Sequence, residues 1–126
     1  MEANKKLVLD MWRVVFEAQN PEAAKDYLAP GYIQHNPQAP TGLDGFVRFF
    51  SAIWKEPKPV QPTLRNPPVL VLTQGDLVQL VFERNTPEPS DPTRTYHSYW
   101  FDLFRVKNGK IVEHWDPATK PPVPRN

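Results

Sequence analysis

The residues with the clearest chemical potential lie near the end of the chain, where His114, Trp115 and Asp116 occupy consecutive positions. They belong to the alternating stretch 110–116, and the side chains of a strand point alternately to its two faces. At least one ionisable group must therefore face the interior, where a carboxylate among aromatic rings loses solvation and becomes a stronger base. The stretch predicts the floor of a ligand pocket in which a carboxylate removes a proton next to a carbonyl group.

The turn at Asn108-Gly109 sets how the last two strands pair. A two-residue turn pairs Lys107 with Lys110, whereas a three-residue loop with Gly109 as a bulge pairs Val106 with Lys110. The two registers differ by one residue, and a slip of one residue exchanges the two faces of a strand. The choice of turn therefore decides whether the polar side chains gather or scatter.

We expect the three-residue loop, because it sets Asp102 opposite His114 and gathers both with Asp116 on one face. The two-residue turn would instead set Asp102 beside Trp115. Three polar side chains that share one pocket are easier to accommodate than three that are each buried alone. In this register the pocket face carries Trp100, Asp102, Phe104, Val112, His114 and Asp116. The opposite face carries Phe101, Leu103, Ile111, Glu113 and Trp115.

The order of the predicted elements indicates the fold class. Helical spacing of apolar residues and a proline start signal predict helices at residues 3–18, 21–29 and 43–55. Extended or alternating stretches predict strands at 31–37, 69–72, 77–82, 95–105 and 110–116, joined by a proline-rich loop at 85–93. Helices followed by an antiparallel sheet predict an α+β fold in one domain of 126 residues, with residues 117–126 as an extended tail.

The composition argues against several classes of partner. The net charge is +1 with both signs interspersed, so no surface for nucleic acid or an anionic membrane is expected. The chain has no cysteine, which rules out disulfides, thiolate metal sites and a cysteine nucleophile. No apolar run could span a bilayer and no stretch resembles a leader, so we expect a cytoplasmic protein.

Several segments match one family in their order and spacing. They are the opening helix, 32–37 (Tyr-Ile-Gln-His-Asn-Pro), Gly42, 75–78 (Gly-Asp-Leu-Val), 102–105 (Asp-Leu-Phe-Arg) and 109–116 (Gly-Lys-Ile-Val-Glu-His-Trp-Asp). Together they resemble the SnoaL-like polyketide cyclases of the nuclear-transport-factor-two-like superfamily. The resemblance implies a cone-shaped barrel, in which three N-terminal helices pack on a strongly curved antiparallel or mixed sheet around an apolar cavity.

The resemblance also implies roles for individual residues. Asp116 stands where the cyclases have the general acid/base of an intramolecular aldol ring closure, and His35 and Asp102 would line the same cavity. The cyclases can carry histidine where Asp102 stands, so a second carboxylate would change the number of protons held by the site. We expect Asp116 as the base, His35 or His114 as the donor, Asp102 as a partner, and no cofactor. The expected substrate, a small apolar carbonyl compound, would contact Tyr32, Asn36, Trp12, Phe50, Trp100 and Val112.

Each assignment has a competing explanation. Asp116 stands at a strand end and could simply cap a backbone group. Asp102 could pair with Arg84 or Arg105, and His35 could be a turn residue. The histidines and aspartates lie on separate segments without a short ligand spacing, so no metal site is expected. The whole domain could also bind a hydrophobic ligand or a partner protein without turnover, because one fold serves many functions.

The face opposite the pocket indicates a subunit contact. Phe101 and Trp115 would lie there, and an exposed aromatic sheet face is a poor surface for a monomer. We therefore expect a homodimer formed through this outer face. His97 belongs to the same face, where a surface or interface role is expected for it.

Overall fold

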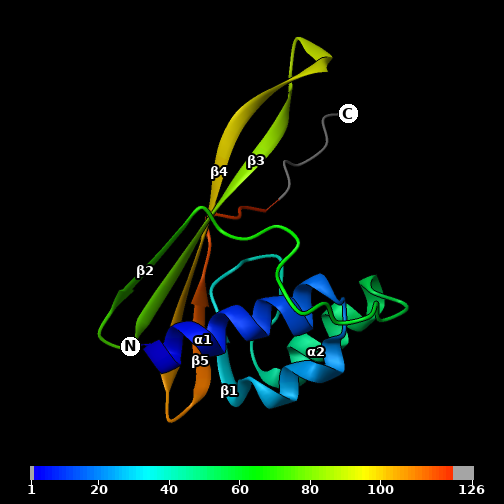
Figure 1. The fold of residues 1–126 in the computed structure, drawn as a ribbon. Coiled ribbons are helices and arrows are strands. Elements are labelled where there is room, and N and C mark those ends of the chain that lie inside the picture. The colour runs from blue at the N-terminus through cyan, green and yellow to red at the C-terminus, as the bar shows by residue number, and fades with distance from the viewer. Residues whose placement is uncertain (1, 121–126) are drawn as a thin grey trace.

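The helices lie on one side of a curved, open sheet, and along the chain one strand precedes the last helix (Figure 1). This computed structural model describes residues 2–120. Its helical elements are α1 (Glu2–Met11), the π-helical continuation η1 (Trp12–Glu17), the 3₁₀ helix η2 (Pro21–Asp26) and α2 (Leu43–Ile53). Its strands are β1 (Leu28–Gln34), β2 (Leu70–Gln74), β3 (Leu77–Glu88), β4 (Asp91–Lys107) and β5 (Lys110–Trp115).

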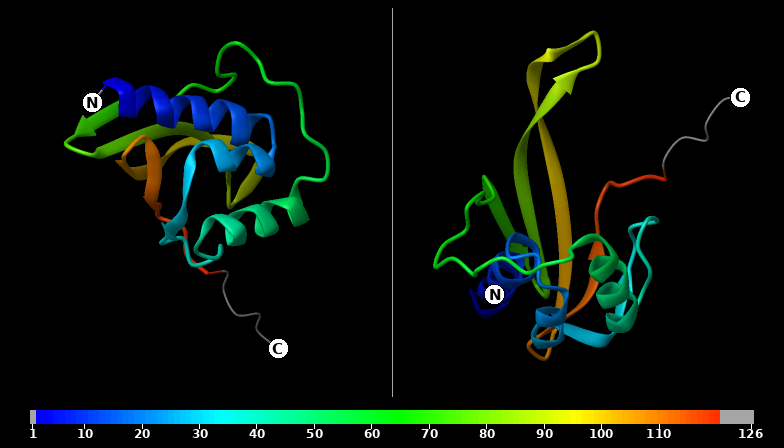
Figure 2. Two further views of the ribbon diagram at one scale, coloured as in Figure 1. Left: turned by 90° about the horizontal axis from the view of Figure 1, so that it is seen from below. Right: turned by 90° about the vertical axis from the view of Figure 1, so that its right-hand side faces the viewer.

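The sheet is mixed and has the strand order β1-β5-β4-β3-β2. β1 runs parallel to β5, and the other neighbours are antiparallel. α1 packs against β3 and α2 against β1, and Figure 2 shows from two further sides how both helices lie on the same side of the sheet. The predicted α+β class is confirmed, whereas the sheet stays open instead of closing into the expected barrel.

The apolar stripe of the first helix forms the centre of the core. Val8, Met11 and Val15 are fully buried, and they cluster with Leu80 and Ile111 of the sheet. Burying an aliphatic side chain of this size stabilises a fold by roughly 1.5–3 kcal/mol. The predicted helix 3–18 is therefore present, although its second half is π-helical.

The second predicted helix is shorter than expected. Pro21 begins it, where a fixed φ and a missing N–H are tolerated, but it is a 3₁₀ helix that ends at Asp26. Strand β1 already starts at Leu28, ahead of the predicted residue 31. Its parallel pairing sets Gln34 beside His114, which brings polar side chains of β1 to the end of β5.

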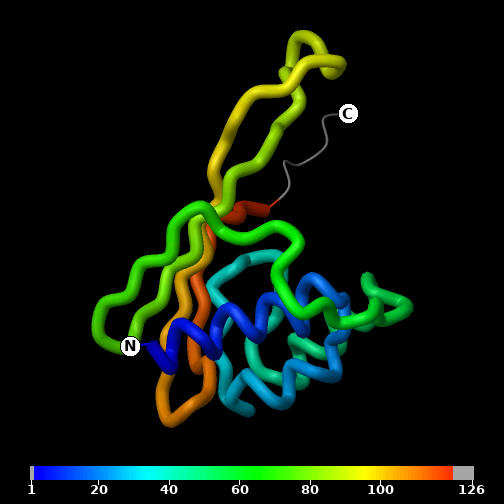
Figure 3. Tube along the Cα trace, in the orientation of Figure 1, coloured from blue at the N-terminus to red at the C-terminus, as the bar shows by residue number. Residues whose placement is uncertain are grey.

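The predicted loop at residues 85–93 is wrong. β3 continues to Glu88 and β4 begins at Asp91, so the two strands form a long two-stranded arm beyond the helices (Figure 3). Pairing extends to Pro87 opposite Thr95 and then, after an irregularity, to Glu88 opposite Asp91. Proline lacks the N–H needed for a central ladder. However, β2 pairs with β3 only up to Val81 and β5 pairs with β4 only from Leu103, so among residues 2–120 each strand of the arm has a partner on one side only. The prolines therefore mark free strand edges here, and not a loop.

The predicted pairing of the last hairpin is also wrong. Asn108 and Gly109 form a two-residue turn with φ values of 52° and 73°, and Lys107 pairs with Lys110. Both positive φ values suit the tight turn whose twist matches that of the flanking strands. The expected pairing of Val106 with Lys110 does not form.

A bulge inside β5 nevertheless restores the expected polar face. The register shifts between Arg105 and Val106, which leaves Val112 as the extra residue of β5. Past the shift Phe104 lies opposite His114, and continuing the register sets Asp116 opposite Asp102. The shift also moves Ile111 into the core, so its predicted outer position, and the predicted inner position of Val112, are wrong.

The described part of the tail, residues 117–120, has no regular secondary structure, and residues 121–126 of the predicted tail lie outside the described residues. Among residues 2–120, no helix is long and apolar enough to cross a bilayer.

Replacing Gly109 by alanine should lower the free energy of unfolding by about 1 kcal/mol, because a Cβ is disfavoured in the left-handed region. Its φ is 73° and no atom lies within 4 Å of the added Cβ, so the cost is backbone strain alone. Gly31→Ala is the matched control, since it also meets open space but has no positive φ. Urea denaturation should show a loss for the first variant only, and equal behaviour of the two would contradict the turn.

Candidate active site

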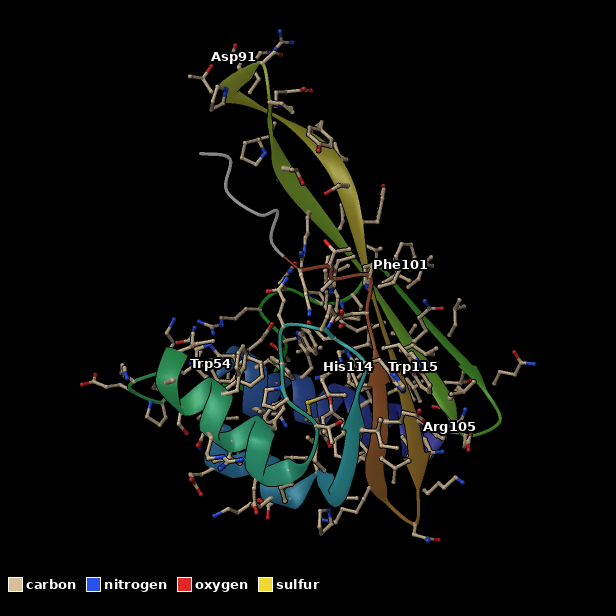
Figure 4. The ribbon with its side chains drawn as sticks, turned by 180° about the vertical axis from the view of Figure 1, so that it is seen from behind. Trp54, Asp91, Phe101, Arg105, His114 and Trp115 are labelled. Atoms are coloured by element: carbon tan, nitrogen blue, oxygen red, sulfur yellow. The ribbon has the colours of Figure 1, made fainter. Side chains whose placement is uncertain are left out.

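A cavity of about 410 Å³ opens between the helices and the end of β5. Its volume lies within the range of small-molecule sites. In Figure 4, His114 and Trp115 lie on opposite sides of β5, with His114 toward α2, the helix followed by Trp54. The cavity is lined by Trp12, Phe16, Gln34, Asn36, Gln38, Ala39, Phe49, Phe50, Ile53, Arg84, Trp100, Asp102, His114 and Asp116.

Aromatic rings form one wall of this cavity. Phe16 is stacked on Trp12 at 4.5 Å between ring centroids and meets the edge of Phe50 at 5.6 Å. Phe50 in turn stacks on Trp54 at 4.3 Å. Rings held against one another keep fixed positions, so this wall suits a flat apolar ligand.

A buried histidine and a buried aspartate form the floor. His114 Nε2 lies 2.8 Å from Asp102 Oδ1, and their side chains are 8% and 4% exposed. The imidazole also stacks on Phe104, with 4.7 Å between the ring centroids. The ring is therefore held in its plane and at one of its nitrogens.

The second nitrogen of His114 is fixed through Gln34. Gln34 Oε1 lies 3.0 Å from the backbone N of Asn36 and 2.7 Å from His114 Nδ1. A backbone N–H can only donate, so the atom it meets must be the amide oxygen and not the NH₂ group. The same oxygen can only accept from the imidazole, and Nδ1 of His114 therefore carries a hydrogen.

This assignment determines what the His114–Asp102 hydrogen bond contains. With Nδ1 protonated, Nε2 either donates to a carboxylate as part of an imidazolium or accepts from a neutral carboxylic acid. Both states place one proton between Nε2 and Asp102 Oδ1. The pair is thus neutral overall in either state, and its hydrogen bond holds one proton inside the cavity.

Asp116 caps a backbone group and also lines the cavity. Its Oδ1 accepts from the backbone N–H of Ala118 at 3.0 Å, which is the capping role of a strand-end carboxylate. Its Oδ2 accepts from Asn36 Nδ2 at 3.0 Å and lies 3.9 Å from His114 Nε2. The side chain is 5% exposed and lines the cavity, and both of its oxygens are fixed by hydrogen bonds.

Asp102 carries an unsatisfied acceptor. Within residues 2–120 its Oδ2 is buried and has no hydrogen-bond partner. Neither arginine considered for it is its partner, because Arg105 bonds Asp76 and Glu113, and Arg84 stacks on Trp100. Leaving a buried acceptor unpaired costs roughly 1–3 kcal/mol or more, which a ligand hydroxyl could recover.

His35 is not where the resemblance predicted. Alternation along the chain sends Gln34 and Asn36 into the cavity and His35 to the outer side of the sheet. There its ring stacks on Trp115 at 4.9 Å, and its Nε2 lies 2.7 Å from Glu113. That hydrogen bond, with Arg105 beside it, holds the pKa of Glu113 below its ordinary value.

Two other predicted contacts also lie outside the cavity. Tyr32 is 2% exposed in the core, where burial raises the pKa of its hydroxyl and Gln34 Nε2 donates to it. Val112 is the extra residue of the β5 bulge. The remaining predictions, Trp12, Asn36, Phe50 and Trp100, do line the cavity.

Sequence reasoning missed several lining residues. Gln34 stands two residues after the buried Tyr32, so alternation along the strand is the signal that places it on the inner face. Arg84 was missed because its segment was expected to end before the strand does. Phe49 and Ile53 belong to the apolar face of α2, whose spacing does not distinguish core from cavity.

Three side chains could approach a cation together. One ligand atom each from Asp102, His114 and Asp116 lies within 4.8 Å of the others. Ligands of a tetrahedral zinc stand about 3.3 Å apart, given metal–ligand bonds near 2.0–2.1 Å. The 2.8 Å separation of His114 Nε2 from Asp102 Oδ1 is that of a hydrogen bond, so the arrangement fits a proton better than a metal.

Comparisons with solved structures identify proteins of the same architecture. A candidate polyketide cyclase from Acidithiobacillus ferrooxidans has 17% identity, covers 90% of this chain and 86% of its own, and gives a TM-score of 0.63. An NTF2-like protein of unknown function from Burkholderia pseudomallei has 17% identity, coverages of 94% and 92%, and a TM-score of 0.64. TerC, co-crystallised with polyporic acid, has 17% identity, coverages of 93% and 92%, and a TM-score of 0.63.

At such identities these structures share the fold alone, and a search of curated proteins finds no match. The sequence itself matches the family described as SnoaL-like domain over residues 8–114. Because this match covers most of the chain, the protein belongs to the SnoaL-like domain family.

Proposed function

We propose that this protein is a cofactor-free enzyme that removes a proton next to the carbonyl group of an apolar substrate, as in an aldol cyclisation or a related isomerisation. The observation that carries the proposal is the position of Asp116, whose nearly buried carboxylate faces an aromatic cavity beside a proton-holding pair. Its membership of the SnoaL-like family and its likeness to a candidate polyketide cyclase are consistent with such a role.

Asp116 is the base in this proposal. Asn36 Nδ2 and the N–H of Ala118 orient the carboxylate, so it need not reorganise when a substrate arrives. The carboxylate is only 5% exposed, so few water molecules have to leave it when an apolar substrate enters. With His35 outside the cavity, His114 is the histidine that remains as a proton donor.

The proposed reaction needs no co-reactant. Asp116 Oδ2 takes the proton of a C–H bond, and that electron pair becomes the enolate. In a cyclisation the enolate carbon then attacks a second carbonyl of the same molecule, which forms a C–C bond and an alkoxide. The alkoxide takes back a proton, so product and substrate have the same atoms. The proton between His114 and Asp102 lies close enough to assist this return.

The rival proposal is a binding module that holds a flat ligand without turnover, as the co-crystallisation of TerC with polyporic acid would suggest. The aromatic wall and the unpaired Asp102 oxygen would serve that role equally well. Only a measurement of proton transfer separates the two.

Deuterium exchange tests the base without knowledge of the natural substrate. The protein should speed exchange of the α-protons of 2-tetralone in D₂O, followed by NMR, and Asp116→Asn should slow it at least about a hundredfold. His35→Gln is the matched control and should exchange as fast as wild type, because His35 lies on the outer face. Wild-type exchange no faster than that of buffer, with 2-tetralone shown to bind, would favour the binding module.

The histidine tautomer can be tested by ¹⁵N NMR of the imidazole. Nδ1 of His114 should carry a hydrogen in the folded protein, because Gln34 Oε1 accepts from it. Gln34→Leu removes that acceptor and should allow the other tautomer, while Asp102→Asn should leave Nδ1 protonated and take the proton from Nε2. An unprotonated Nδ1 in the wild type would contradict the proton held between His114 and Asp102.

We further propose that the protein forms a homodimer through the outer face of the sheet. Large apolar side chains are exposed there, with Leu70 at 56%, Leu72 at 55% and Phe101 at 43%. Their strand pairings set Leu70, Val81 and Phe101 in one row and Leu72, Gln79 and Leu103 in the next. Such a surface is more apolar than a monomer usually exposes to water.

Light scattering at micromolar concentration should give twice the chain mass. Phe101→Glu should produce a monomer, because it introduces a charge into the apolar row. Ala52→Glu, a charge on the exposed side of α2, should leave the mass unchanged. A monomeric wild type would remove the dimer from the proposal.

A further inference from the structure

Arg84 is a solvent-exposed residue of the cavity lining, and it rests on the ring of Trp100 with its N–H donors unpaired among residues 2–120. It follows Leu80 and Phe82 on the inner side of β3, and it lines the cavity. Its guanidinium carbon lies 4.3 Å from the centre of the Trp100 ring. Within residues 2–120, Arg84 has no hydrogen bond to another side chain and no ion pair.

Stacking and hydrogen bonding use different parts of a guanidinium. The face of the group rests on the indole, whereas the N–H donors point outward in its plane. A group fixed by its face loses less freedom when its edge binds an acidic oxygen, and that edge matches a carboxylate in a bidentate fashion. Arg84 on Trp100 is therefore preorganised for an anion.

At the buried end of the cavity, Asp102 offers a hydrogen-bond acceptor, whereas Arg84 offers donors. Asp102 Oδ2 is a buried acceptor without a partner, and Asp102 stands two residues from Trp100 on β4. Two residues of a strand span about 7 Å. A ligand of two fused rings has about the same length as this separation between the backbone positions of Trp100, on which Arg84 rests, and Asp102.

We propose that the cavity binds a flat aromatic compound with an acidic oxygen, a carboxylate or an ionised phenol, at the Arg84 end and a hydroxyl at the Asp102 end. The aromatic wall formed by Phe16 and Phe50 contacts the rings, and Asp116 faces them from the floor. This inference deepens the proposed function, on which it rests for the choice of cavity. Its test is a binding measurement, so failure of turnover does not affect it.

Calorimetric titration with rigid naphthalene probes tests the Arg84 end. The wild type should bind 2-naphthoate at least about tenfold more tightly than the uncharged 2-naphthamide, because only the carboxylate can form a bidentate ion pair with the guanidinium. Arg84→Gln should remove this preference and leave the affinity for the amide nearly unchanged. Arg94→Gln changes the net charge equally on the distant arm and should keep the preference.

The same titration with 6-hydroxy-2-naphthoate tests the Asp102 end. Its hydroxyl stands opposite the carboxylate and should improve binding by about fivefold or more over 2-naphthoate. Equal binding of naphthoate and naphthamide by wild type, or a preference that survives in Arg84→Gln, overturns the proposal. Equal binding of 6-hydroxy-2-naphthoate and 2-naphthoate would contradict the contact between the ligand hydroxyl and Asp102. Arg84 would then remain an anion site.

Discussion

The site depends on one buried hydrogen bond, which joins His114 Nε2 and Asp102 Oδ1 through a shared proton. The backbone N–H of Asn36 fixes the oxygen of Gln34, that oxygen fixes the hydrogen on His114 Nδ1, and the proton shared with Asp102 follows. Because this series of hydrogen bonds starts at a backbone N–H, rotating a side chain cannot reverse its donors and acceptors. The protein thereby keeps two carboxylates and an imidazole in a space where unpaired charges would be costly.

The sheet is built so that this hydrogen bond can form. The parallel strand β1 supplies Gln34 beside His114, and the antiparallel strand β4 supplies Asp102 from the other side. A tight turn alone would have put the polar groups on opposite faces, and one extra residue in β5 corrects the alternation before the functional residues begin. The bulge is thus a requirement of the site, placed between the turn and His114.

Much of the fold could be predicted from sequence, because amphipathic spacing in the first and third helices and alternation in the strands report burial directly. The clustering of Asp102, His114 and Asp116 was also predictable, since burial of three polar groups favours one face. The position of the bulge was not predictable in this way, because either the turn or the strand can hold the one extra residue. His35 was misplaced because resemblance named a position, whereas alternation from buried Tyr32 decides where a side chain points.

The long arm of β3 and β4 has a consequence for the cavity. A two-stranded ribbon without a packed layer is marginally stable in water, so its amides should open to solvent more often than those of the central sheet. Arg84 and Trp100 stand where this ribbon joins the body of the sheet. Opening of the arm that spreads toward the sheet would therefore reach Arg84 and Trp100 before the rest of the cavity. A ligand bound to Arg84 would in turn slow hydrogen exchange along the arm.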